Sequence, residues 1–233
     1  MATSTSTTSQ INALKIYTAC DIADALLKLK VPNAGFIADL GLRTASLRTA
    51  SKNEITIAPA STVLFASKVG KDAAQLPEGN IPSGQHYVDL TQSDSIVILS
   101  QPEDQKCAVL GGIMALRMKV LNARGIVVHG RVRDIEELKS TGLPIWSTGT
   151  SVVGANAEAK PHAIQVPLNI DGTLINPGDL IFLDAVNGVV AIPQDKVADV
   201  IELLPKLVSA DDRVKEDVEQ GVSVNDAFKR HRG

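Results

Sequence analysis

The chain has little of what marks a disulfide-rich, membrane-spanning or nucleic-acid-binding protein. Its 233 residues contain only two cysteines, Cys20 and Cys107, which lie far apart and form no CxxC pattern, so neither a disulfide framework nor a structural zinc site is expected. No apolar run approaches the roughly 18 residues of a membrane span. The net charge is −3, whereas a nucleic-acid surface needs a basic stripe. We therefore expect a cytoplasmic protein that binds neither nucleic acid nor a membrane.

The common short motifs of catalysis are also missing. The sequence has no Walker loop, GxGxxG, HExxH, GxSxG or EF-hand loop, which leaves nucleotide binding, zinc proteolysis and serine hydrolysis without local support. The histidines show no metal-ligand spacing, and we interpret His129, inside a predicted strand, as structural.

What the sequence does have is the composition and pattern of a packed α/β protein. Hydrophobic residues make up 44% of the chain, which predicts a sizeable core. The pattern predicts one helix or two short helices over residues 11–29, with Thr18 and Asp21 as possible caps. It also predicts strands within 55–69 and 94–102, and β-rich structure after Pro144 with Asp-Gly and Asn-Gly turns. We expect residues 1–10 ("MATSTSTTSQ") to be a disordered tail. Residues 11–233 are predicted to form one mixed α/β domain with a helical C-terminal segment from Asp195.

A more specific arrangement is predicted for residues 111–142. Gly111 and Gly112 open a helical segment that Gly125 would close as a C′ glycine, and a strand over 125–130 and a short helix ending at Gly142 follow. The first helix advances about 20 Å at 1.5 Å per residue, and the strand returns about 20 Å at 3.3 Å per residue. The two lengths match, so the strand can pack back along the helix.

This packing would bring charged side chains to the start of the first helix. Arg131, Arg133 and Asp134 would emerge beside Gly111 to Met114, where unpaired backbone N–H groups favour an anion. A guanidinium can bind a carboxylate or keto oxygen, and a single carboxylate suits Mg²⁺ or Mn²⁺, which keep several waters. The alternative is that Asp134 only caps the following helix, while the arginines pair with acids such as Glu136 and Glu137.

Three stretches of the sequence resemble a known family. "LGGIMALRMKVLNARGIVVHGRVRDIEEL", "DIADAL" at 21–26 and "NPGDLIFLDAVNGVVAIP" at 176–193 are similar to the RraA-like family, which includes the 4-hydroxy-4-methyl-2-oxoglutarate aldolases, and most of all to its fungal members. The resemblance runs from about residue 12 to the C-terminus. It implies a swivelling β/β/α-type fold and a homotrimer or homohexamer with active sites at subunit interfaces.

The resemblance also implies an activity and its residues. It implies a class II aldolase that needs a divalent metal cation, Mg²⁺ or Mn²⁺, and cleaves a small 2-keto acid to pyruvate, with oxaloacetate decarboxylation through the same pyruvate enolate. Arg133 and Asp134 are the catalytic residues implied, with Asp134 as the metal ligand. Substrate binding is implied for Arg133 and for the backbone of Gly111, Gly112, Ile113 and Met114.

One position departs from the family pattern, and it keeps other functions open. Many members carry Asp or Glu where this chain has Gly112, and that carboxylate orients a metal-bound water that acts as base. A neighbouring subunit could contribute Asp212 or Glu216 instead. The alternative function is a non-catalytic regulator that binds a protein partner, because the family also contains a ribonuclease inhibitor. A Schiff-base aldolase would use Lys119 as the nearest candidate lysine.

Overall fold

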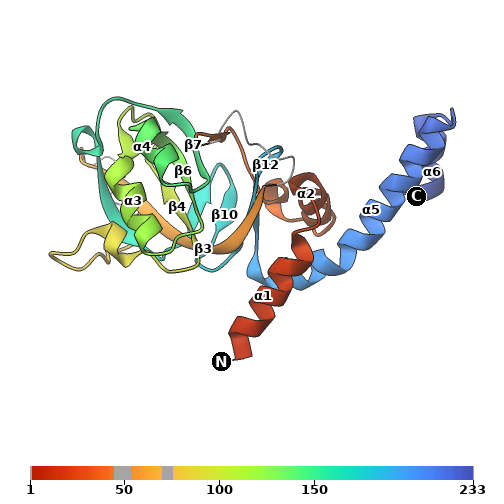
Figure 1. The fold of residues 1–233 in the computed structure, drawn as a ribbon, viewed down its shortest axis with the longest axis horizontal. Coiled ribbons are helices and arrows are strands. Elements are labelled where there is room, and N and C mark those ends of the chain that lie inside the picture. The colour runs from red at the N-terminus through yellow and green to blue at the C-terminus, as the bar shows by residue number, and fades with distance from the viewer. Residues whose placement is uncertain (1, 45–53, 70–75, 233) are drawn as a thin grey trace.

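The computed structural model describes residues 2–44, 54–69 and 76–232, and its centre is a ten-stranded mixed sheet (Figure 1). Its strand order is β1-β12-β11-β3-β4-β6-β7-β2, with β5 added beside β6 and β8 beside β3. The strands are β1 (Phe36–Ile37), β2 (Gly41–Leu42), β3 (Ile55–Ser67), β4 (Ile96–Ser100), β5 (Ala108–Leu110), β6 (Gly125–Val132), β7 (Ile145–Thr150), β8 (Ala159–Ile164), β11 (Leu180–Asp184) and β12 (Gly188–Ile192).

The long strand β3 joins the two halves of this sheet. Its first five residues pair antiparallel with β11, and the stretch from Ala60 to Leu64 pairs parallel with β4. From Val63 onward the strand also pairs antiparallel with β8. Because both halves share this strand, the antiparallel β11–β12 pair and the parallel β4–β6–β7 strands belong to a single continuous sheet.

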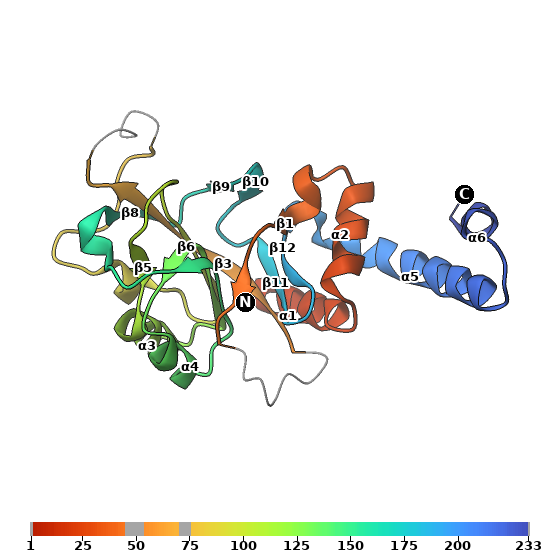
Figure 2. The ribbon, with the colours of Figure 1, turned by 90° about the horizontal axis from the view of Figure 1, so that it is seen from above.

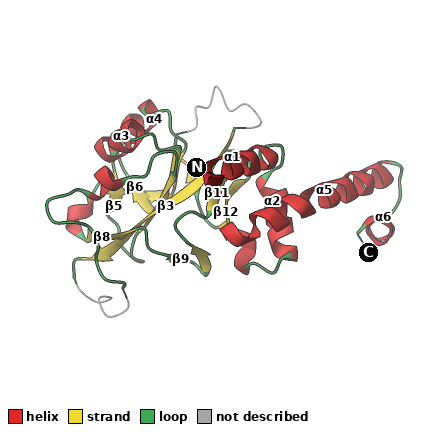
Figure 3. Ribbon diagram, turned by 90° about the horizontal axis from the view of Figure 1, so that it is seen from below, coloured by secondary structure: helices red, strands yellow, loops and turns green. Residues whose placement is uncertain are grey.

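The helices gather at the two ends of the sheet (Figure 3). Helices α3 (Gly112–Val120) and α4 (Ile135–Ser140) pack on β4, β5 and β6, around a core that includes the fully buried Ala115, Met118 and Leu138. Helix α2 (Ala19–Lys28) and the start of α5 (Val197–Glu219) cover β11 and β12. The mixed α/β fold class predicted from the sequence is therefore confirmed.

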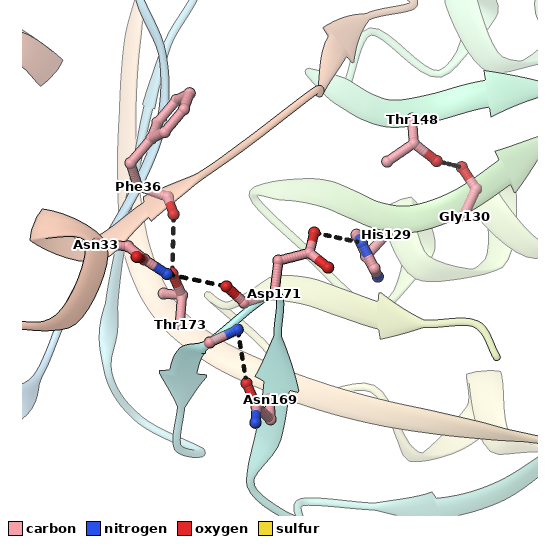
Figure 4. Close-up of polar contacts among 9 residues, drawn as sticks. Asn33, Phe36, His129, Gly130, Thr148, Asn169, Asp171 and Thr173 are labelled. Atoms are coloured by element: carbon pink, nitrogen blue, oxygen red, sulfur yellow. Dashed lines mark hydrogen bonds and ion pairs between the residues drawn. The ribbon is translucent and has the colours of Figure 1, made fainter. Parts of the chain in front are cut away.

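A small antiparallel hairpin, β9 (Leu168–Ile170) and β10 (Thr173–Ile175), is tied to the main sheet by polar contacts (Figure 4). Its turn is the Asp-Gly pair predicted from the sequence, with positive φ at both residues as a two-residue hairpin turn requires. The Asp171 carboxylate lies 3.1 Å from the His129 ring Nε2. Asn33 Nδ2 donates to the Asp171 carbonyl (2.9 Å) and to Thr173 Oγ1 (3.2 Å). His129 thus joins the hairpin to β6, in the structural role expected of it.

Two predicted boundaries differ from the structure. The sequence predicts a disordered tail over residues 1–10, but α1 (Ala2–Leu14) begins at Ala2. Leu14 is fully buried in the core beside α2, with Ile11 packed against it, and serine and threonine cost a helix only a fraction of a kcal/mol each, so the helix extends back from this anchor. The predicted helix from Gly111 ends at Val120, because Asn122 (φ 66°), rather than Gly125, takes the left-handed conformation after it.

The C-terminal helices extend away from the sheet (Figures 1 and 2). The first turns of α5 bury Val197, Val200 and Leu204, while its distal end contacts α6 (Val224–His231), in which Ala227 is the buried residue. This arrangement agrees with the predicted helical segment after Asp195. No helix in the described stretches of the chain is both long and apolar enough to span a bilayer.

Candidate functional site

The site is built where two parallel strands end side by side. Strand β5 pairs with β6 so that Leu110 lies opposite Val132. The next residues are Gly111 at the start of α3 and Arg133 before α4, and the Arg133 N–H donates to the Leu110 carbonyl (3.0 Å). Because parallel strands finish at the same edge of a sheet, the chain delivers Arg133 and Asp134 to the N-terminus of α3. Sequence reasoning predicted this meeting point.

Asp134 faces the start of α3 and does not cap its own helix. Its backbone is left-handed (φ 58°, ψ 47°), and its side chain makes no capping hydrogen bond to α4. Asp134 Oδ2 accepts a hydrogen bond from the Gly112 N–H (3.2 Å) and lies 3.4 Å from Arg133 Nε. Glu136, one of the proposed partners of the arginines, pairs with Lys139 (2.8 Å). The alternative of a simple helix cap with surface ion pairs therefore does not describe this segment.

Arg131 takes a different direction from Arg133. Its Nη1 donates to the Thr150 carbonyl on β7 (3.0 Å). Arg131 is not among the residues that line the cavity described below, and it forms no ion pair with an acid in the described part of the chain. The β6–β7 pairing shifts register between Val128 and Arg131, and such irregularities redirect side chains. The sequence predicted both arginines beside the start of α3, but only Arg133 lies at the site.

The strand ends and the start of α3 border a cavity of about 580 Å³. Five residues predicted for the site line it, and Gly112 lies just outside the lining, with its N–H bound to Asp134. The N–H groups of Ile113 and Met114 have no intrahelical acceptor, and the N-cap residue offers no side chain to cap them. They remain available to an anion. The predicted lining residues are Gly111, Ile113, Met114, Arg133 and Asp134.

Two glycines leave the space that the charged side chains occupy. A Cβ atom at Gly111 would lie 2.7 Å from Asp134 Oδ2, and one at Gly154 would lie 2.9 Å from Arg133 Nη1. Gly111 has an extended backbone that any residue can adopt, so here the glycine matters for its small size. Gly154, in the loop after β7, leaves room for the Arg133 guanidinium, and no sequence motif pointed to it.

The remaining cavity wall comes from segments with no local sequence signal. Besides apolar residues, it includes His86, Tyr87, Asn156 and Lys160. Tyr87 is buried, its hydroxyl lies 3.4 Å from the Val109 carbonyl, and burial raises the pKa of the phenol above its ordinary range. These residues reach the site through tertiary packing: the 3₁₀ turn Tyr87–Leu90 contacts α3 and β8, and the 3₁₀ turn Ala155–Ala157 contacts β5 and β8.

The donor set fits a weakly held hydrated cation better than a fully caged one. Asp134 is the only acidic residue in the cavity lining, and the described residues contain no group of three or more His, Cys, Asp or Glu side chains placed to hold a metal. Mg²⁺ and Mn²⁺ are bound through one or two carboxylates and keep several waters. Lys119 is exposed and lies outside the lining, as do Asp212 and Glu216 on α5.

Two curated relatives are similar to much of this chain. A putative 4-hydroxy-4-methyl-2-oxoglutarate aldolase of Halalkalibacterium halodurans is 31% identical over 173 residues, which are 74% of this chain and 76% of that protein. Protein DlpA of Legionella pneumophila is 29% identical over 182 residues, or 78% of this chain. Those residues span only 28% of the length of DlpA.

Solved structures share the fold. An uncharacterized protein from Pseudomonas syringae pv. tomato superposes with a TM-score of 0.73 at 24% identity, over 94% of this chain and 96% of that one. RraAS2 of Streptomyces coelicolor, described as an unusual member of the RNase ES inhibitor RraA protein family, superposes with a TM-score of 0.67 at 20% identity, over 91% and 96%. A model of the family described as RraA-like, Aldolase/RraA, matches residues 19–191. The chain therefore belongs to the RraA-like (Aldolase/RraA) family.

Proposed function

We propose that this protein is a divalent-metal-dependent lyase that cleaves 4-hydroxy-4-methyl-2-oxoglutarate to pyruvate and also decarboxylates oxaloacetate. The observation that carries the proposal is the cavity at the N-terminus of α3, in which Asp134 is the single acid among the cations Arg133 and Lys160. The excess of positive charge suits a dicarboxylic 2-keto acid. The name of the Halalkalibacterium relative supports the same substrate class.

The residues of the chain can bind and orient such a substrate. The free N–H groups of Ile113 and Met114, at the positive end of α3, suit a substrate carboxylate. Arg133 stabilises the negative charge that develops on the keto oxygen as the C–C bond breaks. The contact with Gly154 on one side and the ion pair with Asp134 on the other limit the positions of the guanidinium.

The role proposed for Asp134 is to hold the divalent cation. Mg²⁺ or Mn²⁺ in this position would supply Lewis acidity toward the keto oxygen. Asp134 is prepared for this role because one of its oxygens is fixed by the Gly112 N–H. Aldol cleavage and β-decarboxylation generate the same pyruvate enolate, so one arrangement of Arg133 and Asp134 serves both reactions.

A coupled pyruvate assay tests the proposal on the purified protein. With oxaloacetate or 4-hydroxy-4-methyl-2-oxoglutarate, we expect turnover that EDTA abolishes and that Mg²⁺ or Mn²⁺ restores. Asp134→Asn should lose this metal-dependent activity, whereas Asp195→Asn, on the surface in the 3₁₀ turn before α5, should keep it. Full activity in EDTA, or in Asp134→Asn, would contradict the proposal.

We also propose that the protein assembles as a homotrimer or homohexamer through α3. One side of this helix exposes Ile113, Leu116 and Val120, whose exposed fractions are 73%, 55% and 66%. Their spacing of three and four residues places them on one helix face, and Ile113 also lines the cavity. A second copy bound to this face would lie at the cavity mouth, as the family resemblance implies for an active site between subunits.

The same apolar face favours a second candidate function, the regulation of a protein partner. Contiguous exposed apolar residues are typical of protein-binding surfaces, and the fold is shared with a protein described as a ribonuclease-inhibitor family member. The two functions are distinguished by turnover. A protein that shows no lyase activity with any divalent metal and that binds a ribonuclease stably would favour the regulatory function.

A further inference from the structure

The two glycines that begin α3 each face one acidic side chain. Gly111 lies against the carboxylate of Asp134, and a Cβ atom at Gly112 would collide with Oε2 of Glu137 and would lie 2.5 Å from Glu137 Cβ. The backbone of Gly112 is not in the left-handed region, so this position needs a glycine for its small size. The Glu137 side chain therefore fills the space that a side chain at residue 112 would need.

The Glu137 carboxylate has no hydrogen-bond or ion-pair partner among the described residues. Its neighbour Glu136, in contrast, binds Lys139, and Arg133 binds Asp134. Glu137 lies in the first turn of α4, three residues after Asp134, which precedes that helix. Asp134 accepts a hydrogen bond from the Gly112 N–H, and the Glu137 side chain occupies the space where a Cβ atom of residue 112 would lie.

We infer that Glu137 is the second carboxylate of the site, a positioning residue that strengthens the hold of Asp134 on a hydrated divalent cation, and that Gly112 makes room for it. The inference rests on the proposed function. Glu137 lies outside the cavity lining, whereas Asp134 lies within it. Glu137 would therefore act without touching the cation, by adding negative charge next to Gly112, whose N–H binds Asp134.

A purely structural explanation makes a different prediction. Gly112 could be small only so that α4 can pack closely on α3, and the charge of Glu137 would then be irrelevant. Glu137→Gln keeps the length and shape of the side chain and removes its charge, so the two explanations diverge for this variant. Glu136→Gln is the matched control, because Glu136 is adjacent, exposed and paired with Lys139.

The test measures Mn²⁺ binding to the full chain by electron paramagnetic resonance, without substrate. Partners that act through a ligand typically contribute 10- to 100-fold to metal affinity, so we expect Glu137→Gln to weaken Mn²⁺ binding about 10-fold and Glu136→Gln to leave it unchanged. In the oxaloacetate assay kcat should fall more than KM rises for Glu137→Gln. Mn²⁺ affinity equal to that of the wild type would overturn the inference.

A double-mutant cycle tests the role of Gly112. Gly112→Ala should weaken Mn²⁺ binding in the wild type by displacing the Glu137 carboxylate, and should add little to Glu137→Gln because the two residues act together. Additive losses would show that Gly112 acts independently of that charge. If the wild type binds no Mn²⁺, or if Asp134→Asn binds it normally, the proposed function itself fails. If Asp134→Asn loses Mn²⁺ binding while Glu137→Gln keeps it, only the inference about Glu137 is rejected.

Discussion

Arg133 and Asp134 show how single residues are positioned by contacts from other segments. Asp134 has a left-handed backbone, a conformation that costs a non-glycine residue about 1 kcal/mol or more, and the hydrogen bond from the Gly112 N–H holds its side chain in that position. The Arg133 guanidinium lies between this carboxylate and Gly154. Both side chains are thus held before any ligand binds.

The planar guanidinium of Arg133 is important for its proposed role. Arg133→Lys keeps the charge but loses the planar set of donors, so we expect kcat/KM for oxaloacetate to fall about 100-fold, as when one charge-stabilising donor is removed. Arg131→Lys is the control, because Arg131 donates to the Thr150 carbonyl on β7. Steady-state pyruvate release measures both variants, and equal losses in the two would argue against a special role for Arg133.

Asp184 gives a prediction about stability and pH. It is buried, and it accepts hydrogen bonds from the Ala19 N–H (3.0 Å), the Val186 N–H (3.0 Å) and Asn187 Nδ2 (2.8 Å). Burial alone raises its pKa, but these donors outweigh burial and the pKa lies below its ordinary value. The stabilising contribution of Asp184 is therefore complete above the unfolded-state pKa of about 4 and is lost as the pH falls through the lower folded-state pKa.

Urea denaturation of Asp184→Asn measures this contribution. At pH 7 the variant should lose about 2 kcal/mol of unfolding free energy, the scale of hydrogen bonds to a charged group. The difference from the wild type should shrink as the pH falls below about 4. Asp195→Asn, a surface control, should stay within about 0.5 kcal/mol of the wild type; a pH-independent difference for Asp184→Asn would argue against the charge effect.

At the scale of elements, the ends of the helices are set by short local motifs whose importance depends on packing. Thr18 and Asp21, which the sequence predicted as possible caps, form a capping box at the start of α2 with Thr18 as the N-cap and Asp21 at N3. Ser223 caps α6 in a similar way through the Asp226 N–H. Helix α2 buries Ile22 and Leu26 in the core, whereas α6 lies at the far end of α5 (Figure 2).

The two caps should therefore differ in their effect on global stability. Thr18→Ala should lower the free energy of unfolding by about 1 kcal/mol, because α2 unfolds only with the core. Ser223→Ala should change global unfolding less and instead speed hydrogen exchange in α6, which can open locally. Urea denaturation and hydrogen exchange of the two variants measure these effects. The same global loss in both would indicate that α6 unfolds with the core.

In the whole molecule, two features are exposed outside the packed core. One is the apolar face of α3, and the other is the α5–α6 segment, which projects away from the body (Figure 1). In the proposed assembly, the apolar face of α3 would contact another copy of the chain. That residues 11–233 behave as a single domain stays a prediction.

Charges on the α3 face should dissociate the proposed assembly. Leu116→Glu together with Val120→Glu would place two carboxylates in a contact that excludes water, at a cost of several kcal/mol. We expect sedimentation to show a monomer for this variant and a trimer or hexamer for the wild type. Lys119→Glu, on the same helix but outside the apolar face, serves as the charge control. An unchanged assembly in the double variant would contradict an interface at α3.

Much of the element order could be predicted from periodicity, while the surroundings of the site could not. Alternating and apolar runs predicted the strands near Ile55 and Ile96, and Asp-Gly predicted the turn at Asp171. The cavity wall at His86 and Lys160 had no signal, because residues far apart in sequence meet only through tertiary packing. The register shift that turns Arg131 toward β7 was equally invisible.

The amino-acid sequence indicated the family through the resemblance of its motifs. It also predicted that Arg133 and Asp134 could meet the start of α3, because the lengths of the helix and the strand restrict where the strand can end. The role of each side chain at this site depends on the packing of the folded chain. In the folded chain, Asp134 accepts a hydrogen bond from the Gly112 N–H and does not cap its own helix. Arg131 donates to β7, away from Arg133, and the Glu137 side chain lies against Gly112. These outcomes depend on distances between neighbouring elements, which periodicity and spacing along one chain do not contain.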